Sequence, residues 1–168
     1  NNSGSTFAGF GTVSNGFVNL GNLTATNGTL NLVNAPVQSG TVTVANASTL
    51  NVAQAWQNSG TLAMTGGSVA GSTLTNAGTI RGSGTFTPTV VNTGTMSLTS
   101  GQTLTFTATT MSNSAAAVIQ NTGGSIALTD PNANFILTGG TGSNTFEFGS
   151  GTLTFNGTTG TKTLGLAS

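Results

Sequence analysis

Apolar residues recur at every second position in short runs along this chain, and a small residue followed by Thr or Ser opens most of these runs. Residues 28–32 read Gly-Thr-Leu-Asn-Leu, and residues 40–44 read Gly-Thr-Val-Thr-Val. This alternation is typical of half-buried β-strands, with the apolar side chains facing a core. The repeated apolar positions, which we expect to form that core, are Leu30, Leu32, Val42, Val44, Leu50, Val52, Leu62, Met64, Met96, Leu98, Leu104, Phe106, Ile126, Leu128, Phe146, Phe148, Leu153 and Phe155.

The spacing of the runs has a longer period. Successive hydroxyl positions at Thr29, Thr41, Thr49 and Thr61 alternate between a longer and a shorter separation. Two interleaved series result, Thr29 to Thr49 and Thr41 to Thr61, and each repeats with a period of about 20 residues. A unit of this size cannot bury its own apolar face, whereas stacked units form a continuous core.

The sequence therefore predicts one all-β domain over residues 1–168, a parallel β-helix (β-solenoid) of roughly 20-residue coils and about eight turns. An antiparallel β-sandwich is the alternative, because it also has short strands with frequent turns.

A second repeated feature is an Asn two residues before a Gly-Thr step, at Asn58, Asn76 and Asn92. Asn that recurs at one position of every coil can form a hydrogen-bonded ladder along the stack. Gly at the corners supplies the backbone conformations that tight turns require.

The pattern loosens near residues 52–57 and 107–122, where we expect an inserted loop or a surface that faces a partner. The lone Trp56 lies in the first segment and is expected to fill a corner of the coil. In the second segment, residues 112–120 are the one candidate for a short helix, with Ser112 or Ser114 as its cap.

Composition then removes whole classes of function. Only 2% of the residues are charged, namely two basic and two acidic residues, and there is no His or Cys. Two basic side chains cannot neutralise a run of phosphates, so nucleic-acid binding is not expected. Metal sites built from His or Cys and Ser-His or Cys-His nucleophiles are excluded, and no cofactor is expected. No apolar stretch approaches the length of a membrane-spanning helix, so membrane insertion is not expected either.

The two carboxylates, Asp130 and Glu147, are separated by slightly less than one coil, which could place them on neighbouring turns. Asp130 precedes Pro131 in a turn sequence, however, and Glu147 is expected to point outward between two Phe residues. An acid pair for hydrolysis is therefore not favoured, and the chain is not expected to be an enzyme.

With its Asn-x-Gly-Thr-apolar-x-apolar repeats in Thr-, Asn- and Gly-rich coils, the chain resembles filamentous-haemagglutinin-type adhesins and autotransporter passenger domains over about residues 15 to 157. The resemblance implies a right-handed parallel β-helix on a bacterial surface, and thus an extracellular or cell-surface location. The secretion domains of those families are not found in this sequence, and its charge content is lower than is usual for such passengers.

The function favoured by the sequence is a structural subunit of an extracellular fibre or adhesin-like surface protein, consistent with a biofilm matrix. A solenoid exposes strand edges at its ends, and proteins normally guard such edges with charge or Pro. Here the terminal segments, residues 5–13 and 152–166, alternate apolar residues, contain no Pro and are uncapped. The expected partner is therefore the chain itself, joined head to tail by stacking or strand donation. The expected interface residues are Phe7, Phe10, Val13, Leu164 and Leu166.

Two alternatives stay open. A monomeric adhesin segment would bind glycans or other cell-surface material without polymerising, with Trp56 as the one evident sugar-stacking residue. An ice-binding solenoid would need Thr-x-Thr triplets once per coil on one face. The triplets are spaced too irregularly along the chain to predict such a row; they begin at Thr41, Thr73, Thr85, Thr103 and Thr152.

Overall fold

The structure is a computed structural model of the whole chain. It describes residues 1–114, 117–130, 134–138, 145–147, 152–155 and 163–167, and the side chains within the first two of these ranges.

Within these residues the chain forms strands and no helix. They are β1 (Thr6–Val13), β2 (Val18–Asn19), β3 (Asn22–Leu32), β4 (Val37–Gln38), β5 (Thr41–Ala45), β6 (Thr49–Val52), β7 (Trp56–Asn58), β8 (Thr61–Gly71), β9 (Leu74–Asn76), β10 (Thr79–Phe86), β11 (Val90–Asn92), β12 (Thr95–Thr99), β13 (Thr103–Phe106), β14 (Thr110–Asn113), β15 (Val118–Thr122), β16 (Ser125–Leu128), β17 (Asn134–Thr138), β18 (Thr145–Glu147), β19 (Thr152–Phe155) and β20 (Thr163–Ala167).

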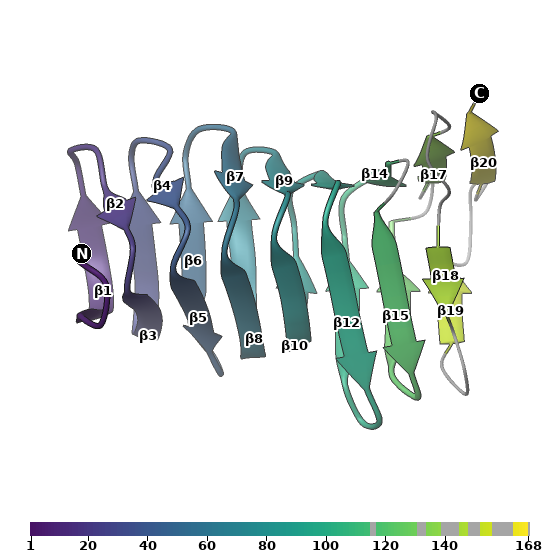
Figure 1. Cartoon of the computed structure of the whole chain (residues 1–168), viewed down its shortest axis with the longest axis horizontal. Helices are drawn as coiled ribbons and strands as arrows, with labels where there is room; N and C mark the ends of the chain where they lie inside the picture. Colours follow the sequence, from purple (N-terminus) through teal and green to yellow (C-terminus); the bar gives the residue numbers. More distant parts are fainter. Residues whose placement is uncertain (115–116, 131–133, 139–144, 148–151, 156–162, 168) are drawn as a thin grey trace.

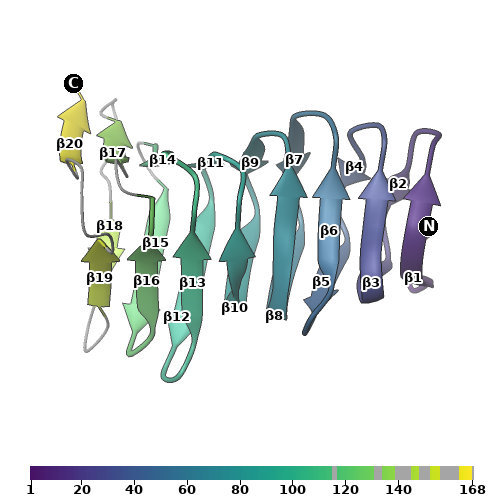
Figure 2. The ribbon, with the colours of Figure 1, turned by 180° about the vertical axis from the view of Figure 1, so that it is seen from behind.

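The strands stack as a solenoid whose coils follow one another along a single axis (Figure 1). One sheet has the order β1-β3-β5-β8-β10-β12-β15-β18, with β6, β13, β16 and β19 pairing beside this path. The second sheet has the order β2-β4-β7-β9-β11-β14-β17-β20. The view from behind in Figure 2 shows β6, β13, β16 and β19 as the side of the stack opposite to β5, β12, β15 and β18.

All of the strand pairs in the described residues are parallel, such as β5 with β8 and β7 with β9, which excludes the antiparallel sandwich. The predicted parallel β-solenoid is confirmed, with about six turns of about 19 residues rather than the expected eight turns. Coil length varies considerably. Thr79 pairs with Thr95 to close a short coil, whereas Thr95 pairs with Val118 to close a coil that is several residues longer.

The interior is a column of apolar side chains that runs the length of the described coils. Each strand contributes alternate residues, as in β5, where Val42 and Val44 are buried while the Thr residues on either side are partly exposed. Two coils stack Phe86 on Phe106, with ring centroids 5.2 Å apart. This narrow core accounts for the low apolar content, because each strand buries only a few side chains.

In their described residues, the two segments predicted to be loose both take part in the parallel strand pairing. Only three residues separate β6 from β7, so no loop is inserted at 52–57. Trp56 is buried, 4% exposed, in β7, where it pairs in register with Leu74. The helix expected over 112–120 is wrong for its described residues, because β14 ends at Asn113 and β15 begins at Val118. The Ala-rich composition favours a helix locally, but parallel pairing with β12 and burial of Ile119 outweigh that preference.

Candidate functional site

Buried amide side chains form a continuous ladder inside the solenoid along the second sheet. Its members, one per coil, are Asn19, Gln38, Asn58, Asn76, Asn92 and Asn113, each at most 3% exposed. Asn58 Nδ2 donates to Asn76 Oδ1 at 2.8 Å, and Asn76 Nδ2 donates in turn to Asn92 Oδ1 at 2.8 Å. Asn1 Nδ2 precedes the ladder and donates to Asn19 Oδ1 at 2.8 Å. The predicted Asn ladder is thus confirmed, and it extends beyond the three Asn residues of the repeat.

The amides of the ladder also hold the corners of their coils. Asn76 Nδ2 lies 3.3 Å from the Gly78 carbonyl oxygen and 3.0 Å from the Thr95 carbonyl oxygen of the next coil. Asn58 and Asn92 repeat the same arrangement in their own coils. The buried side chains therefore satisfy one another and the backbone at once, which is the condition under which buried polar groups stabilise a fold.

Glycines stack directly beside the ladder at the same corner, as Gly21, Gly40, Gly60, Gly78 and Gly94. A Cβ atom built on Gly60 would collide with the Gly40 carbonyl oxygen, and one built on Gly78 would collide with the Gly60 carbonyl oxygen. The backbone is this close because Thr61 N donates to Gly40 O and Thr79 N donates to Gly60 O, at 3.0 and 2.8 Å. The Asn-x-Gly-Thr repeat is therefore the sequence of one corner: an inward amide, a residue without a side chain, and the first outward residue of the next strand.

The first coil is the end of the described stack. Among the described residues, β1 pairs with β3 alone, so that its other edge offers unpaired backbone groups. Phe7 occupies the column of Leu23 and Val42. It is nevertheless 41% exposed, whereas Leu23 and Val42 are each 1% exposed. The core is therefore open to solvent at this end.

The exposed large apolar side chains of the described residues all belong to the first two coils: Phe7, Phe10, Val18, Leu20, Val33 and Val37. Phe10 is 67% exposed and Val37 is 61% exposed. In the next two coils the outward position of Val37 is taken by Gln57 and Thr75, which are polar, and then by Val91, which is only partly exposed. The apolar surface is thus confined to the region around the open end.

The other end of the stack is formed by β18, β19 and β20, each of which pairs on one side only among the described residues. Leu164 and Leu166 lie on β20 in register with Phe135 and Leu137, and through them with Met111 and Asn113. Their backbone positions therefore continue two inward columns of the core. The two sets of predicted interface residues lie at opposite ends of the chain's stack (Figure 1).

The predicted core positions fall where the repeat placed them. Those with described side chains, from Leu30 to Leu128, are at most 2% exposed. Phe146, Leu153 and Phe155 lie on strands in register with Ile119, Ile126 and Leu128, and Phe148 lies outside the described residues. Val13, expected at the interface, is half-buried and packs against the core.

The structure gives no side-chain geometry that would make Asp130 and Glu147 an acid pair. Asp130 follows β16 and is partly exposed, while Glu147 ends β18, where side chains are not described. In the described part of the chain, no three His, Cys, Asp or Glu side chains gather into a group that could hold a metal ion. No helix of the described residues could span a membrane.

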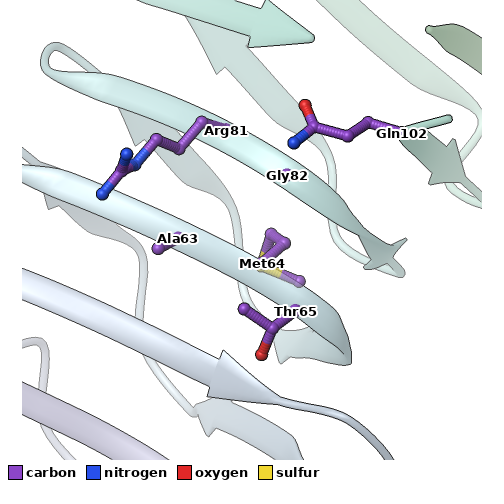
Figure 3. A pocket seen from close by; sticks show the side chains of 6 residues that line it. All are labelled: Ala63, Met64, Thr65, Arg81, Gly82 and Gln102. Atoms are coloured by element: carbon purple, nitrogen blue, oxygen red, sulfur yellow. The ribbon is translucent and has the colours of Figure 1, made fainter. Parts of the chain in front are cut away.

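One recess opens on the outer surface, with a volume of about 280 Å³. We call it the Arg81 pocket; its lining residues are Ala63, Met64, Thr65, Arg81, Gly82 and Gln102. In Figure 3, Arg81 and Gln102 lie on either side of Gly82, above Ala63, Met64 and Thr65. Sequence reasoning did not find this pocket, although the lone Arg in a nearly uncharged surface was a signal that could have drawn attention to it.

The fold defines the chain as a β-solenoid repeat protein. Comparison with protein-family models, with curated proteins and with solved structures finds no match, and nothing in it links the chain to the adhesin families that its repeats resemble.

Proposed function

We propose that this chain is a structural subunit or segment of an extracellular fibre or adhesin-like surface protein, and that its solenoids stack end to end. The observation that carries this proposal is the exposed core of the first coil. Phe7 stands at an inward position whose counterparts in the next coils are fully covered, so another coil placed on β1 would bury it. The ends of the chain are different surfaces, so contacts between them are heterologous and propagate into filaments rather than closing a dimer.

Backbone geometry supports the same assembly. The free edge of β1 lacks Lys, Arg, Pro and acidic residues, which are the groups that proteins use to block edge pairing. At the other end, β18 to β20 each have one unpaired edge among the described residues. The second sheet has eight strands, six of them (β2 to β14) within residues 1–114 and two more, β17 and β20, beyond the described side chains. With neighbouring strands about 4.8 Å apart, eight strands give stacked subunits an axial repeat of about 38 Å along a filament.

The experiment compares the wild type with a charged end. Negative-stain micrographs and light scattering across a concentration series should show filaments of the wild type with an axial repeat of about 38 Å. Phe7→Asp and, separately, Phe10→Asp should shift the protein towards monomers, because stacking would bury an unpaired carboxylate. Gln57→Asp adds the same charge on an exposed side position and should leave the filaments intact.

Circular dichroism verifies that each variant keeps its strand content, so loss of fold is not mistaken for loss of assembly. Phe10 is the safer position in this respect, since its side chain is mostly in solvent. Folded wild-type protein that stays monodisperse at high concentration would refute end-to-end stacking. The monomeric adhesin segment would then be the better description.

Ice binding is a second candidate, and one observation favours it. Although the Thr-x-Thr triplets form no row, the outward residues Thr41, Thr61, Thr79 and Thr95 lie in one column in register across four successive coils. The neighbouring outward column contains Thr43, Ala63, Arg81 and Ser97, which interrupts a flat Thr array. Measurement of thermal hysteresis and ice recrystallisation at micromolar protein decides this candidate: no effect on ice growth excludes it.

A further inference from the structure

The Arg81 pocket is formed by a step in the outline of the solenoid. The coil that begins at Thr79 ends where Thr95 pairs with it, whereas the coil that begins at Thr95 is longer and reaches Val118. The shorter coil turns its corner through Gly82, at φ 96°, while the longer coil continues to Thr99 and returns through Gln102. In Figure 1 the corner that follows β12 extends beyond that of β10. The longer corner therefore overhangs the shorter one and forms one wall of the pocket.

Hydrogen-bond donors without partners line this pocket. Gln102 Oε1 accepts from Thr99 N at 2.9 Å, which fixes the side-chain amide and leaves its Nε2 donors without a partner among the described residues. Arg81 is exposed and has neither a hydrogen bond nor an ion pair in the described structure. Thr65 Oγ1 donates to the Val44 carbonyl at 3.1 Å. Arg81 and Gln102 together thus offer a cationic fork and an amide, with Met64 and Ala63 as apolar neighbours.

No carboxylate of the described residues lines the pocket. Along the strand register, Arg81 pairs with Ala63 on one side and Ser97 on the other, which cannot neutralise it. Glu147 follows in the same column after Gln120, three strands from Arg81. Three strand spacings are about 14 Å, more than the Debye length of about 8 Å at physiological salt. The charge of Arg81 is therefore available to a ligand.

We propose that the Arg81 pocket binds a carboxylate-bearing sugar, such as a uronate residue of an acidic polysaccharide. The guanidinium forms two parallel hydrogen bonds to a carboxylate, which is the geometry that distinguishes Arg from a point charge. Gln102 Nε2 donates to a ring hydroxyl or to the same carboxylate, and the outward methyl group of Ala63 contacts the C–H face of the sugar. The volume suits one monosaccharide unit of a chain that continues into solvent.

This site is independent of end-to-end stacking, because it lies on the side of the fourth, fifth and sixth coils. A filament would display it once per subunit, and a long acidic polysaccharide would then engage many weak sites at once. A monomer retains the site. Binding by monomers and failure of assembly are therefore separate results.

The test is a titration of the folded protein with D-glucuronate, followed by NMR. We expect saturable shifts of the Gln102 side-chain amide and the Ala63 methyl signals, with a dissociation constant on the order of 1 mM. Arg81→Gln should weaken binding at least about tenfold, because the charge-assisted bonds are lost. Gln102→Ala should weaken it less, and Gln57→Ala, an exposed Gln on another face, should leave it unchanged.

Two comparisons make the result decisive. D-Glucose at the same concentration lacks the carboxylate and should produce no saturable shift, while acetate should bind more weakly than glucuronate because it lacks the sugar. Equal shifts with glucose, equal affinity for acetate, or unchanged binding by Arg81→Gln would each overturn the proposal. Retention of strand content by Arg81→Gln, measured by circular dichroism, shows that lost binding is not lost fold.

Discussion

Replacement of Asn76 by Ala tests whether the amide ladder holds the coils together. Asn76 is fully buried at the middle of the ladder, where its Oδ1 accepts from Asn58 and its Nδ2 donates to Asn92. Truncation removes both bonds and also the contacts from Nδ2 to the carbonyls of Gly78 and Thr95. The substitution therefore deprives two other buried amides, those of Asn58 and Asn92, of the partner that they share.

The magnitude follows from the groups left unpaired. Asn92 Oδ1 loses its donor, and one N–H of Asn58 loses its acceptor. Each buried polar group without a partner costs about 1 to 3 kcal/mol. Two such groups give about 2 to 6 kcal/mol, and a water molecule that enters the space left by the amide brings the cost towards the lower limit. We expect a loss of at least about 2 kcal/mol in the free energy of unfolding.

A second Asn pair supplies the matched control. Asn51 Nδ2 donates to Asn31 Oδ1 at 3.0 Å, but this pair is part-buried and outward, with access to solvent. Asn51→Ala removes the same atoms and should cost less than about 1 kcal/mol, because water replaces the lost partner. Urea unfolding is followed through the fluorescence of Trp56, the sole Trp, which is buried in β7. If Asn76→Ala and Asn51→Ala lower the stability equally, the ladder does not have the role assigned to it.

The remaining predictions concern the same corner. Gly60→Ala should lower the free energy of unfolding by about 1 to 3 kcal/mol, because the new Cβ meets the backbone of Gly40. Gly16→Ala is its control, since a Cβ on Gly16 has open space around it. In the same urea titration, this control should be neutral or slightly stabilising. Asn76→Asp should make stability depend on pH, because burial raises the pKa of the new carboxyl group above the unfolded value of about 3.9. The stability of the variant is therefore highest below about pH 3.9, where the carboxyl group is neutral in both states, and it falls as pH rises through the folded pKa. Thermal melts at pH 3.5 and 7 check this, and a melting temperature of Asn76→Asp that changes with pH no more than that of the wild type would contradict it.

The sequence repeat predicts the corner better than it predicts the coil. Asn58, Asn76 and Asn92 all precede a Gly-Thr step, so the motif identifies these members of the ladder directly. Gln38 also precedes Ser-Gly-Thr, but a motif that requires Asn at this position does not include Gln. Asn113 is hidden for another reason: Ala117 and Val118 stand where Gly and Thr stand in the earlier coils, after a longer connection.

The spacing of the repeats in the sequence does not predict the length of each individual coil. An average period of about 20 residues conceals a short coil that begins at Thr79 and a long one that begins at Thr95. Residues added or removed at corners leave the paired strands in register. For this reason the outward Thr column that runs from Thr41 to Thr95 is not visible as a constant spacing. The Arg81 pocket depends on the same irregularity, since it arises where a short corner lies beside a long one.

The scarcity of charge connects the interior of this protein with its proposed assembly. Polar interactions that stabilise the stack are made by neutral amides inside it, as between Asn58 and Asn76, so the fold does not depend on surface ion pairs. The outer columns can therefore carry Thr, Ser and Asn, and the edge of β1 carries no charge that would oppose another strand. Growth along the axis then adds the same backbone pairing and apolar burial that join one coil to the next within the chain. The cation Arg81 lies on the side of the stack, on β10, and not at its ends. It can therefore bind the proposed carboxylate ligand without opposing growth along the axis.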